Sequence, residues 1–152
     1  MNEWEIKNIN DFQDVTNTIL DKATEILESK NNATVVALHG DLGSGKTTFT
    51  KQLAKELGIK ETITSPTFVI QKRFDIPKEN NIYKFDKLIH IDTYRIDLQD
   101  ELIKLGWNED VAQSQNIISI EWPENVIDIL PENTIHLYFE FIDETTRVVR
   151  LK

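Results

Sequence analysis

Residues Thr34 to Thr48 read Thr-Val-Val-Ala-Leu-His-Gly-Asp-Leu-Gly-Ser-Gly-Lys-Thr-Thr, and the chain continues Phe-Thr-Lys-Gln-Leu-Ala-Lys-Glu-Leu to Leu57. The stretch contains the spacing G-x-x-x-x-G-K-[ST] of a phosphate-binding loop, formed by Gly40, Gly45, Lys46 and Thr47. An apolar run precedes this spacing and a segment of helical periodicity follows it, which is the strand–loop–helix context that the loop requires. The sequence therefore predicts a nucleotide site here, and a plain glycine-rich turn is the alternative.

The residue types in this loop suit a polyphosphate. Successive backbone N–H groups in a tight loop form a concave anion site, and glycines at 40, 43 and 45 allow positive φ and close approach of the ligand. The helix that begins near Lys46 adds unpaired N–H groups and a favourable dipole. Lys46 can reach the β- and γ-phosphate oxygens, and the hydroxyl of Thr47 can bind Mg²⁺.

Length and composition limit the possible functions. A chain of 152 residues that is 39% hydrophobic fits one domain, residues 1–152. A net charge of −9 argues against a large basic face that grips nucleic acid alone, so any RNA is expected to come with a partner. There is no cysteine, which excludes disulfides and thiolate metal sites. The sequence shows no membrane span and no signal peptide, and we expect a soluble cytoplasmic protein.

Hydrophobic periodicity predicts an α/β fold built around the strand at 34–38. That strand is apolar on both faces, as expected for a central parallel strand covered by helices. The pattern predicts a short strand near 4–8 and helices at 11–27 and 46–57, the first capped by Asn10 or Asp11 and the second ended by Gly58.

In the second half of the chain, the hydrophobic pattern predicts mostly strands. Residues 67–76 and 88–96 are expected to form a β-hairpin around an exposed turn at 77–84. A short helix from Asp97 to Gly106, an apolar strand at 117–120 and a helix at 126–130 led by Pro123 follow. Strands at 134–142 and 147–151 close the chain. The expected fold is a three-layer P-loop NTPase fold, whose mostly parallel sheet carries an antiparallel hairpin and C-terminal antiparallel strands between flanking helices.

Two carboxylates end apolar strands and are candidates for the second half of the site. Asp92 ends Leu-Ile-His-Ile-Asp, and Glu121 ends Ile-Ile-Ser-Ile-Glu. In folds of this kind an acidic residue at the end of a strand beside the phosphate-loop strand steadies the Mg²⁺. The strand before Glu121 is the more continuously apolar, so we assign Glu121 to the metal. Asp92 is placed nearer the γ-phosphate and its attacking water.

The residues around Asp92 alternate between the two faces of the same strand. A period of two places His90, Asp92 and Tyr94 on one face of the strand, and Thr93 and Arg95 on the other. Solvation where the sheet ends is the alternative for Asp92. His90 is interpreted as a core histidine and Tyr94 as a packing residue. Arg95 suits either an arginine finger or a surface ion pair.

Two further features lie close to these strands. The hydroxyls of Ser65 and Thr67 could sense the γ-phosphate as GTPase switch segments do, or belong to an ordinary turn before a strand. Trp122 follows Glu121 and could stack on the base or gate the site, with a core position as the alternative.

Four ordered motifs resemble those of the bacterial TsaE (YjeE) family, and the likeness extends from about Asn10 to Glu132. The phosphate loop alone is common to many proteins, whereas the set of four in this order and spacing is much more specific. The motifs are Gly40-Asp41-Leu42-Gly43-Ser44-Gly45-Lys46-Thr47-Thr48, Ser65-Pro66-Thr67-Phe68, His90-Ile91-Asp92-Thr93-Tyr94-Arg95 and Ile120-Glu121-Trp122-Pro123-Glu124.

The resemblance implies an ATPase subunit of the machinery that makes N6-threonylcarbamoyladenosine at position 37 of tRNA (t6A37). Such proteins are weak Mg²⁺-dependent ATPases on their own. They act with a TsaD-type threonylcarbamoyl transferase and its TsaB-type companion, and ATP hydrolysis is thought to reset that complex between rounds. tRNA is reached only through the complex.

The resemblance also implies roles for individual residues. Lys46, Asp92 and Glu121 would be catalytic, and Thr47 and Glu121 would attend Mg²⁺. Ser65 and Thr67 would belong to a switch-like segment, and adenine would be contacted near Asp11 and Glu132. The nucleotide would be held by the loop and one tryptophan: Asp41, Leu42, Gly43, Ser44, Gly45, Lys46, Thr47, Thr48 and Trp122.

Two other functions fit the same residues. A small-molecule kinase would use Asp92 as base and Arg95 as clamp, but no arginine-rich lid segment follows Gly106. A nucleotide-gated binding module would bind without hydrolysis, but two acidic candidates and Thr47 argue against it. ATP is favoured over GTP because no Asn-Lys-x-Asp guanine-reading motif is present.

Overall fold

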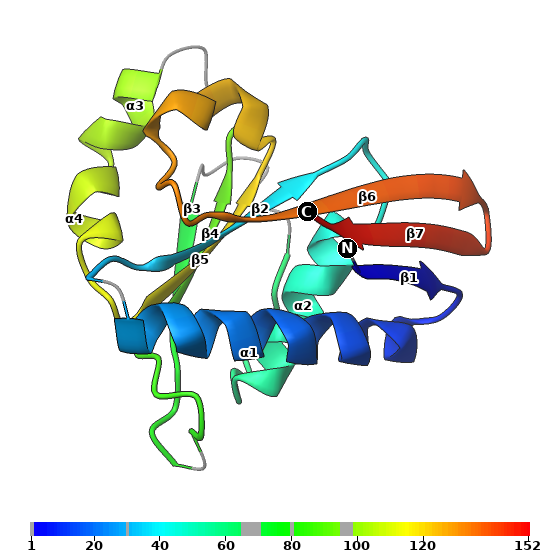
Figure 1. Cartoon of the computed structure of the whole chain (residues 1–152), viewed down its shortest axis with the longest axis horizontal. Coiled ribbons are helices and arrows are strands. Elements are labelled where there is room, and N and C mark those ends of the chain that lie inside the picture. The colour runs from blue at the N-terminus through cyan, green and yellow to red at the C-terminus, as the bar shows by residue number, and fades with distance from the viewer. Residues whose placement is uncertain (1, 30, 65–70, 80, 95–98) are drawn as a thin grey trace.

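A mixed β-sheet of seven strands organises the computed structural model, which describes residues 2–29, 31–64, 71–79, 81–94 and 99–152 (Figure 1). The strand order is β1-β7-β6-β2-β5-β4-β3. The strands are β1 (Asn2–Ile6), β2 (Thr34–His39), β3 (Gln71–Asp75), β4 (Lys87–Asp92), β5 (Asn116–Glu121), β6 (Ile135–Asp143) and β7 (Thr146–Leu151). The α-helices are α1 (Phe12–Ser29), α2 (Lys46–Glu56), α3 (Gln99–Lys104) and α4 (Trp107–Val111), with 3₁₀ turns η1 (Ile9–Asp11) and η2 (Pro123–Ile129).

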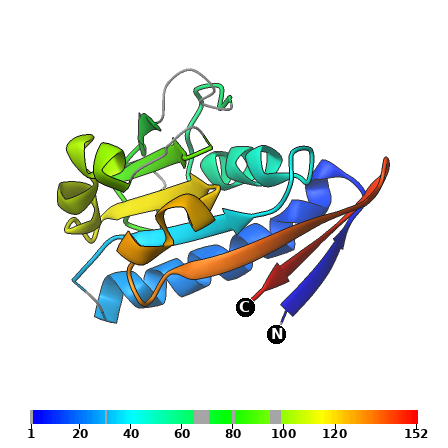
Figure 2. The ribbon, with the colours of Figure 1, turned by 90° about the horizontal axis from the view of Figure 1, so that it is seen from above.

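The predicted α/β class with a mixed sheet and flanking helices is confirmed. β2 lies in the middle and pairs in parallel with both β5 and β6, and β4 pairs in parallel with β5. The predicted hairpin is present as the antiparallel pair β3–β4. β6 and β7 are antiparallel to each other, as predicted, and β1 joins β7, so the two ends of the chain lie side by side (Figure 2).

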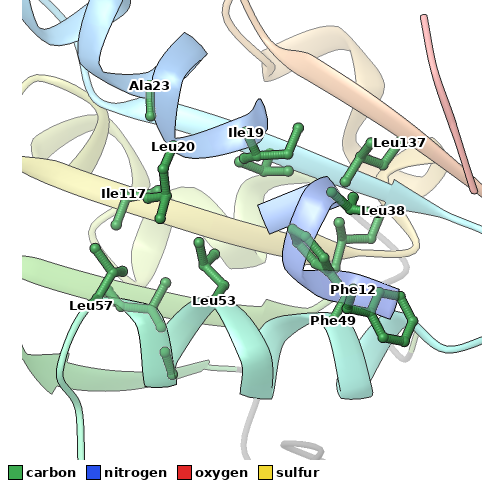
Figure 3. Close-up of a cluster of buried hydrophobic side chains, with 14 of the residues drawn as sticks. Phe12, Ile19, Leu20, Ala23, Leu38, Phe49, Leu53, Leu57, Ile117 and Leu137 are labelled. Atoms are coloured by element: carbon green, nitrogen blue, oxygen red, sulfur yellow. The ribbon is translucent and has the colours of Figure 1, made fainter. Parts of the chain in front are cut away.

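Two hydrophobic clusters cover opposite faces of the sheet. The larger one gathers the apolar stripes of α1 and α2 on the face that carries Val36 and Leu38 (Figure 3). The other lies under α3, α4 and η2, on the face that carries Val35 and Ala37. Alternation along β2 therefore supplies both clusters, which explains why its sequence is apolar throughout.

The ends of the helices show why these segments stop where they do. α1 is preceded by η1, whose cap is Asn8, with Asp11 closing a reciprocal capping box; the predicted cap at Asn10 or Asp11 was wrong by two or three residues. α2 ends as predicted at Gly58, which has φ 84°. There the N–H groups of Gly58 and Ile59 donate to the carbonyls of Lys55 and Ala54, the pattern of a Schellman motif.

Three details differ from the sequence-based expectation. α4 was not predicted, because it has only five residues and three of them are Asn, Glu and Asp. The predicted helix at 126–130 is instead the 3₁₀ segment η2, which starts at Pro123 and is kinked at Val126. The predicted cap Asp97 lies outside the described residues. Among the helices that are described, none is long and apolar enough to cross a membrane.

Truncating Phe49 should strongly destabilise the fold. This α2 side chain is fully buried, and its ring lies 6.4 Å from that of Phe12 and 5.9 Å from that of Phe139. We expect Phe49→Ala to lower the free energy of unfolding by about 3–5 kcal/mol. Ile82 is 76% exposed, so Ile82→Ala should change it by less than about 0.5 kcal/mol. Urea denaturation followed by circular dichroism measures both, and equal losses would contradict this packing.

Candidate functional site

The register of three parallel strands brings the candidate residues to one edge of the sheet. Leu38 of β2 pairs with Glu121 of β5, and Glu121 pairs with Asp92 of β4. The glycine-rich loop begins at Gly40, just beyond β2, and leads into α2. The loop and both predicted carboxylates therefore lie at the carboxyl ends of the parallel strands, where ligands bind in open α/β sheets.

The loop needs glycine for both conformation and space. Gly43 and Gly45 have φ of 79° and 108°, which residues with a Cβ rarely adopt. At Gly40 an added Cβ would lie 2.6 Å from the carbonyl oxygen of Phe139. Inside the loop, Ser44 is buried, and its hydroxyl donates to the carbonyl of Asp41 at 2.6 Å. A serine thus fits this position because it closes the loop on itself.

Lys46 lies at the start of α2, with its side chain turned back along the loop. The residue is only 4% exposed, and its ammonium group donates to the carbonyl of Gly40. Its Nζ also lies 3.9 Å from the centre of the Trp122 ring. Burial lowers the pKa of Lys46, although nearby carboxylates, Glu121 first, act in the opposite direction. A ligand with strong negative charge would offset this desolvation.

Glu121 connects three elements of the structure. It is 4% exposed, and its Oε2 accepts hydrogen bonds from Thr47 Oγ1 at 3.3 Å and from His90 Nε2 at 2.8 Å. A carboxylate only accepts, so the hydrogen lies on Nε2 of His90. His90 was interpreted as a core histidine, and it is indeed fully buried. Its hydrogen bond to Glu121 was not predicted from the sequence. The only sequence signal was its position two residues before Asp92 on the same strand face.

Asp92 is partly buried beside Glu121. Its Oδ1 accepts the backbone N–H of Tyr94 at 2.9 Å. Burial raises the pKa of Asp92 above its ordinary value, and the negative charge of Glu121 adds to this, while the Tyr94 N–H acts against it. A nearby cation would favour the ionised form.

Trp122 adopts an unusual backbone conformation next to Glu121. Its φ is 59° and ψ 49°, a left-handed conformation that is uncommon for a large side chain. Thr93 and Asn125 hold this turn, because both donate to the carbonyl of Trp122. The ring of Tyr94, which is 56% exposed, lies 5.1 Å from that of Trp122. The structure thus places Trp122 over Lys46, and not in either hydrophobic cluster.

A cavity of about 620 Å³ lies at this edge of the sheet. Nine of the predicted site residues line it: Leu42, Gly43, Gly45, Lys46, Thr47, Thr48, Asp92, Glu121 and Trp122. Asp41 and Ser44, also predicted to hold the nucleotide, do not line the cavity: Asp41 is exposed, and the buried Ser44 donates its hydroxyl to the Asp41 carbonyl. The opposite wall comes from the two ends of the chain: Ile6, Lys7, Asn8, Ile9, Phe12, Glu144, Thr145 and Arg147.

The predicted adenine contacts are only partly near this cavity. Asp11 does not line it, and its carboxylate accepts the N–H groups of Lys7 and Asn8. Its neighbours Ile9 and Phe12 do. Glu132 is not among the lining residues, whereas Glu144 and Thr145 of the turn between β6 and β7 are. The sequence predicted a turn here between two strands but not its place in the cavity lining, because the turn carries no motif. The predicted residues Ser65, Thr67 and Arg95 lie outside the described residues.

The oxygen donors at this edge suit a hard divalent cation. Thr47 and Glu121 already approach each other, and Asp92 pairs with Glu121 along the strand register. Across the described ranges, no group of three or more acidic, histidine or cysteine side chains could hold a metal alone. Mg²⁺ is commonly bound by one or two protein oxygens together with phosphate oxygens and water, so the donor set fits Mg²⁺ that arrives with a nucleotide.

A histidine pair lies just before the loop. Nε2 of His39 and Nδ1 of His136 are 2.9 Å apart, and the His39 ring stacks on Tyr138 with centroids 4.3 Å apart. Glu124 approaches the other nitrogen of His39 at 3.7 Å. Burial lowers the pKa of both histidines, and the facing imidazole lowers that of His39 further.

The fold and this edge define an α/β protein whose glycine-rich loop, lysine and carboxylates meet at the carboxyl ends of parallel strands. Comparison with known proteins gives the family. Residues 13–149 match the model of "Threonylcarbamoyl adenosine biosynthesis protein TsaE", and the chain belongs to this family.

Individual relatives agree with the family match. The chain is 38% identical to the tRNA threonylcarbamoyladenosine biosynthesis protein TsaE of Borreliella burgdorferi, over 77% of this chain and 80% of that one. It is 35% identical to the protein of the same name from Aquifex aeolicus, over 85% and 84% of the two chains. The crystal structure of YdiB from Bacillus subtilis superposes with a TM-score of 0.65 at 25% identity, covering 99% of this chain and 83% of that one.

The histidine pair should make stability depend on pH. Both folded pKa values lie below the unfolded value of about 6.5, so the unfolded chain binds more protons as the pH falls through that value. We expect the free energy of unfolding to decrease from pH 7 to pH 5. His136→Gln should make this decrease smaller. Urea denaturation at pH 7, 6 and 5 measures it, and an unchanged pH dependence in the variant would contradict the assignment.

Proposed function

We propose that this protein is the Mg²⁺-dependent ATPase subunit of the t6A37 tRNA-modification machinery, with a three-layer P-loop NTPase fold in one domain. It would act with a TsaD-type transferase and a TsaB-type companion, and its hydrolysis of ATP would reset their complex. The observation that supports this most is the convergence of the loop, Lys46, Thr47, Glu121 and Asp92 on one cavity. The names of the relatives support the pathway.

The loop and α2 would bind the phosphates. The first N–H groups of an α-helix have no partner within the helix and attract anions. Lys46 would exchange the carbonyl of Gly40 for phosphate oxygens, and because it is held over Trp122 it needs little rearrangement. Thr47 and Glu121 would hold Mg²⁺, which neutralises charge on the phosphates when it is bound.

Asp92 would position the attacking water. Its carboxylate lies at the level of Glu121 on the next strand and lines the same cavity. As an acceptor it can orient a water whose oxygen attacks the γ-phosphorus, while the β–γ bridging oxygen leaves with ADP. His90 would keep Glu121 in place through its 2.8 Å hydrogen bond. The products are ADP and inorganic phosphate.

Lys46 and Glu121 should separate binding from turnover. Lys46→Ala removes a charged donor to the phosphates, and we expect nucleotide affinity to fall by about 10- to 100-fold. Glu121→Ala should leave binding largely intact but abolish Mg²⁺-dependent hydrolysis. Calorimetry and phosphate release measure the two effects. Lys51 is exposed on the same helix, so Lys51→Ala serves as the control and should behave as wild type. Equal affinity in Lys46→Ala and wild type would refute the assignment.

Hydrolysis should depend on partners. We expect slow phosphate release by the protein alone, stimulation on adding the TsaB–TsaD pair, and loss of both activities in Asp92→Asn. Full-rate turnover without partners would count against the proposal, and so would equal rates for Asp92→Asn and wild type. Transfer of label from ATP to a small acceptor would favour the kinase alternative.

A further inference from the structure

Arg147 connects the C-terminal hairpin to the tip of the glycine-rich loop. It lies in β7, and its Nε donates to the carbonyl of Gly43 at 2.9 Å, across a sequence separation of 104 residues. It also lines the cavity. No sequence motif marks this residue, and none of the roles given above uses it.

The guanidinium group is held in place by the hairpin itself. Its Nη1 donates to the carbonyl of Asp143 at 2.7 Å and to that of Thr146 at 3.3 Å. The central carbon lies 4.4 Å from the centre of the Phe141 ring. A planar, stacked guanidinium with several donors loses little freedom when it forms one more hydrogen bond. Arg147 therefore presents a preformed donor to the loop.

The contact fixes the orientation of one peptide at the loop tip. A trans peptide is planar, so holding the carbonyl of Gly43 toward Arg147 directs the N–H of Ser44 the opposite way. In the structure this N–H donates to the carbonyl of Asp41 at 3.2 Å. An added Cβ at Gly43 would meet none of the described atoms within 4 Å, so the space beside this residue is open. The hydrogen bond from Arg147 therefore restrains the loop tip from outside the loop, in addition to the two bonds from Ser44 to the Asp41 carbonyl.

The charge of Arg147 also suits this position. The chain has a net charge of −9, and the cavity contains the carboxylates of Asp92, Glu121 and Glu144. A polyphosphate entering it meets repulsion from these groups. Arg147 adds a positive charge to this cavity from β7, which β6 and β2 separate from β5 in the sheet.

We propose that Arg147 is a positioning residue for polyphosphate binding, which orders the loop tip through the carbonyl of Gly43 and adds positive charge to the cavity. This inference rests on the proposed function, in which the loop binds a nucleotide. Its consequence is that nucleotide affinity depends on the β6–β7 hairpin as well as on the loop.

Calorimetric titration with ADP and Mg²⁺ tests the inference on the full chain. Arg147→Met keeps the aliphatic stem and should weaken ADP binding about tenfold, the loss expected for one charge-assisted hydrogen bond. Arg147→Lys keeps the positive charge but not the planar set of guanidinium donors, so its loss of ADP affinity should be smaller than that of Arg147→Met. AMP, which has a single phosphate, should be affected less than ADP. Hydrogen exchange of the unliganded loop, residues 40–45, should be faster in Arg147→Met.

Arg150 provides the matched control. It lies on the same strand, and its guanidinium pairs with Glu3 and Glu140 at 2.7 and 2.6 Å, outside the cavity. Arg150→Met should bind ADP as wild type does. Equal ADP affinity in Arg147→Met and wild type would overturn the inference and leave the proposed function standing. If wild type itself binds no nucleotide, both are overturned. If Arg147→Met does not fold, Arg147→Lys decides: unchanged affinity and unchanged exchange would overturn the inference.

Discussion

The common register of β2, β5 and β4 is the constraint on which the candidate site depends. Because the three strands are parallel and Leu38, Glu121 and Asp92 pair across them, their carboxyl ends finish at the same level. The strand register alone therefore brings the loop after β2 and the two carboxylates to the same edge of the sheet. A shift of one residue in either pairing would turn a carboxylate to the other face of the sheet.

Around this edge, the buried charges are held by short-range contacts within the protein. Lys46 donates to a loop carbonyl and lies against Trp122, and Glu121 accepts from His90 and Thr47. Each contact reduces the cost of burying a charged side chain. Burial lowers the pKa of Lys46 and the nearby carboxylates, Glu121 first, only partly oppose this, so the site favours a ligand with negative charge. A Mg²⁺–polyphosphate would bring negative charge to Lys46 and positive charge to Glu121.

Much of the central sheet could be predicted from the sequence, and the rim of the site could not. The apolar runs before Gly40 and after Asn116 identified β2 and β5, and with them the position of Glu121, because fully buried parallel strands leave a continuous hydrophobic signal. The contact between His90 and Glu121 depends on side chains of neighbouring strands, which periodicity along one strand does not report. Arg147 and the wall from the chain ends were missed for the same reason: they reach the loop only through tertiary folding. α4 is too short to show a helical period.

The central claim is that this edge of the sheet binds a Mg²⁺–nucleotide through its phosphates. The most direct measurement is isothermal calorimetry of the folded wild-type chain with ATP and with ADP, each with and without Mg²⁺. The account predicts saturable one-to-one binding of both nucleotides that is strengthened by Mg²⁺, and much weaker binding of adenosine. Absence of binding heat for ATP and ADP across millimolar concentrations at several temperatures, with the chain shown to be folded, would contradict it.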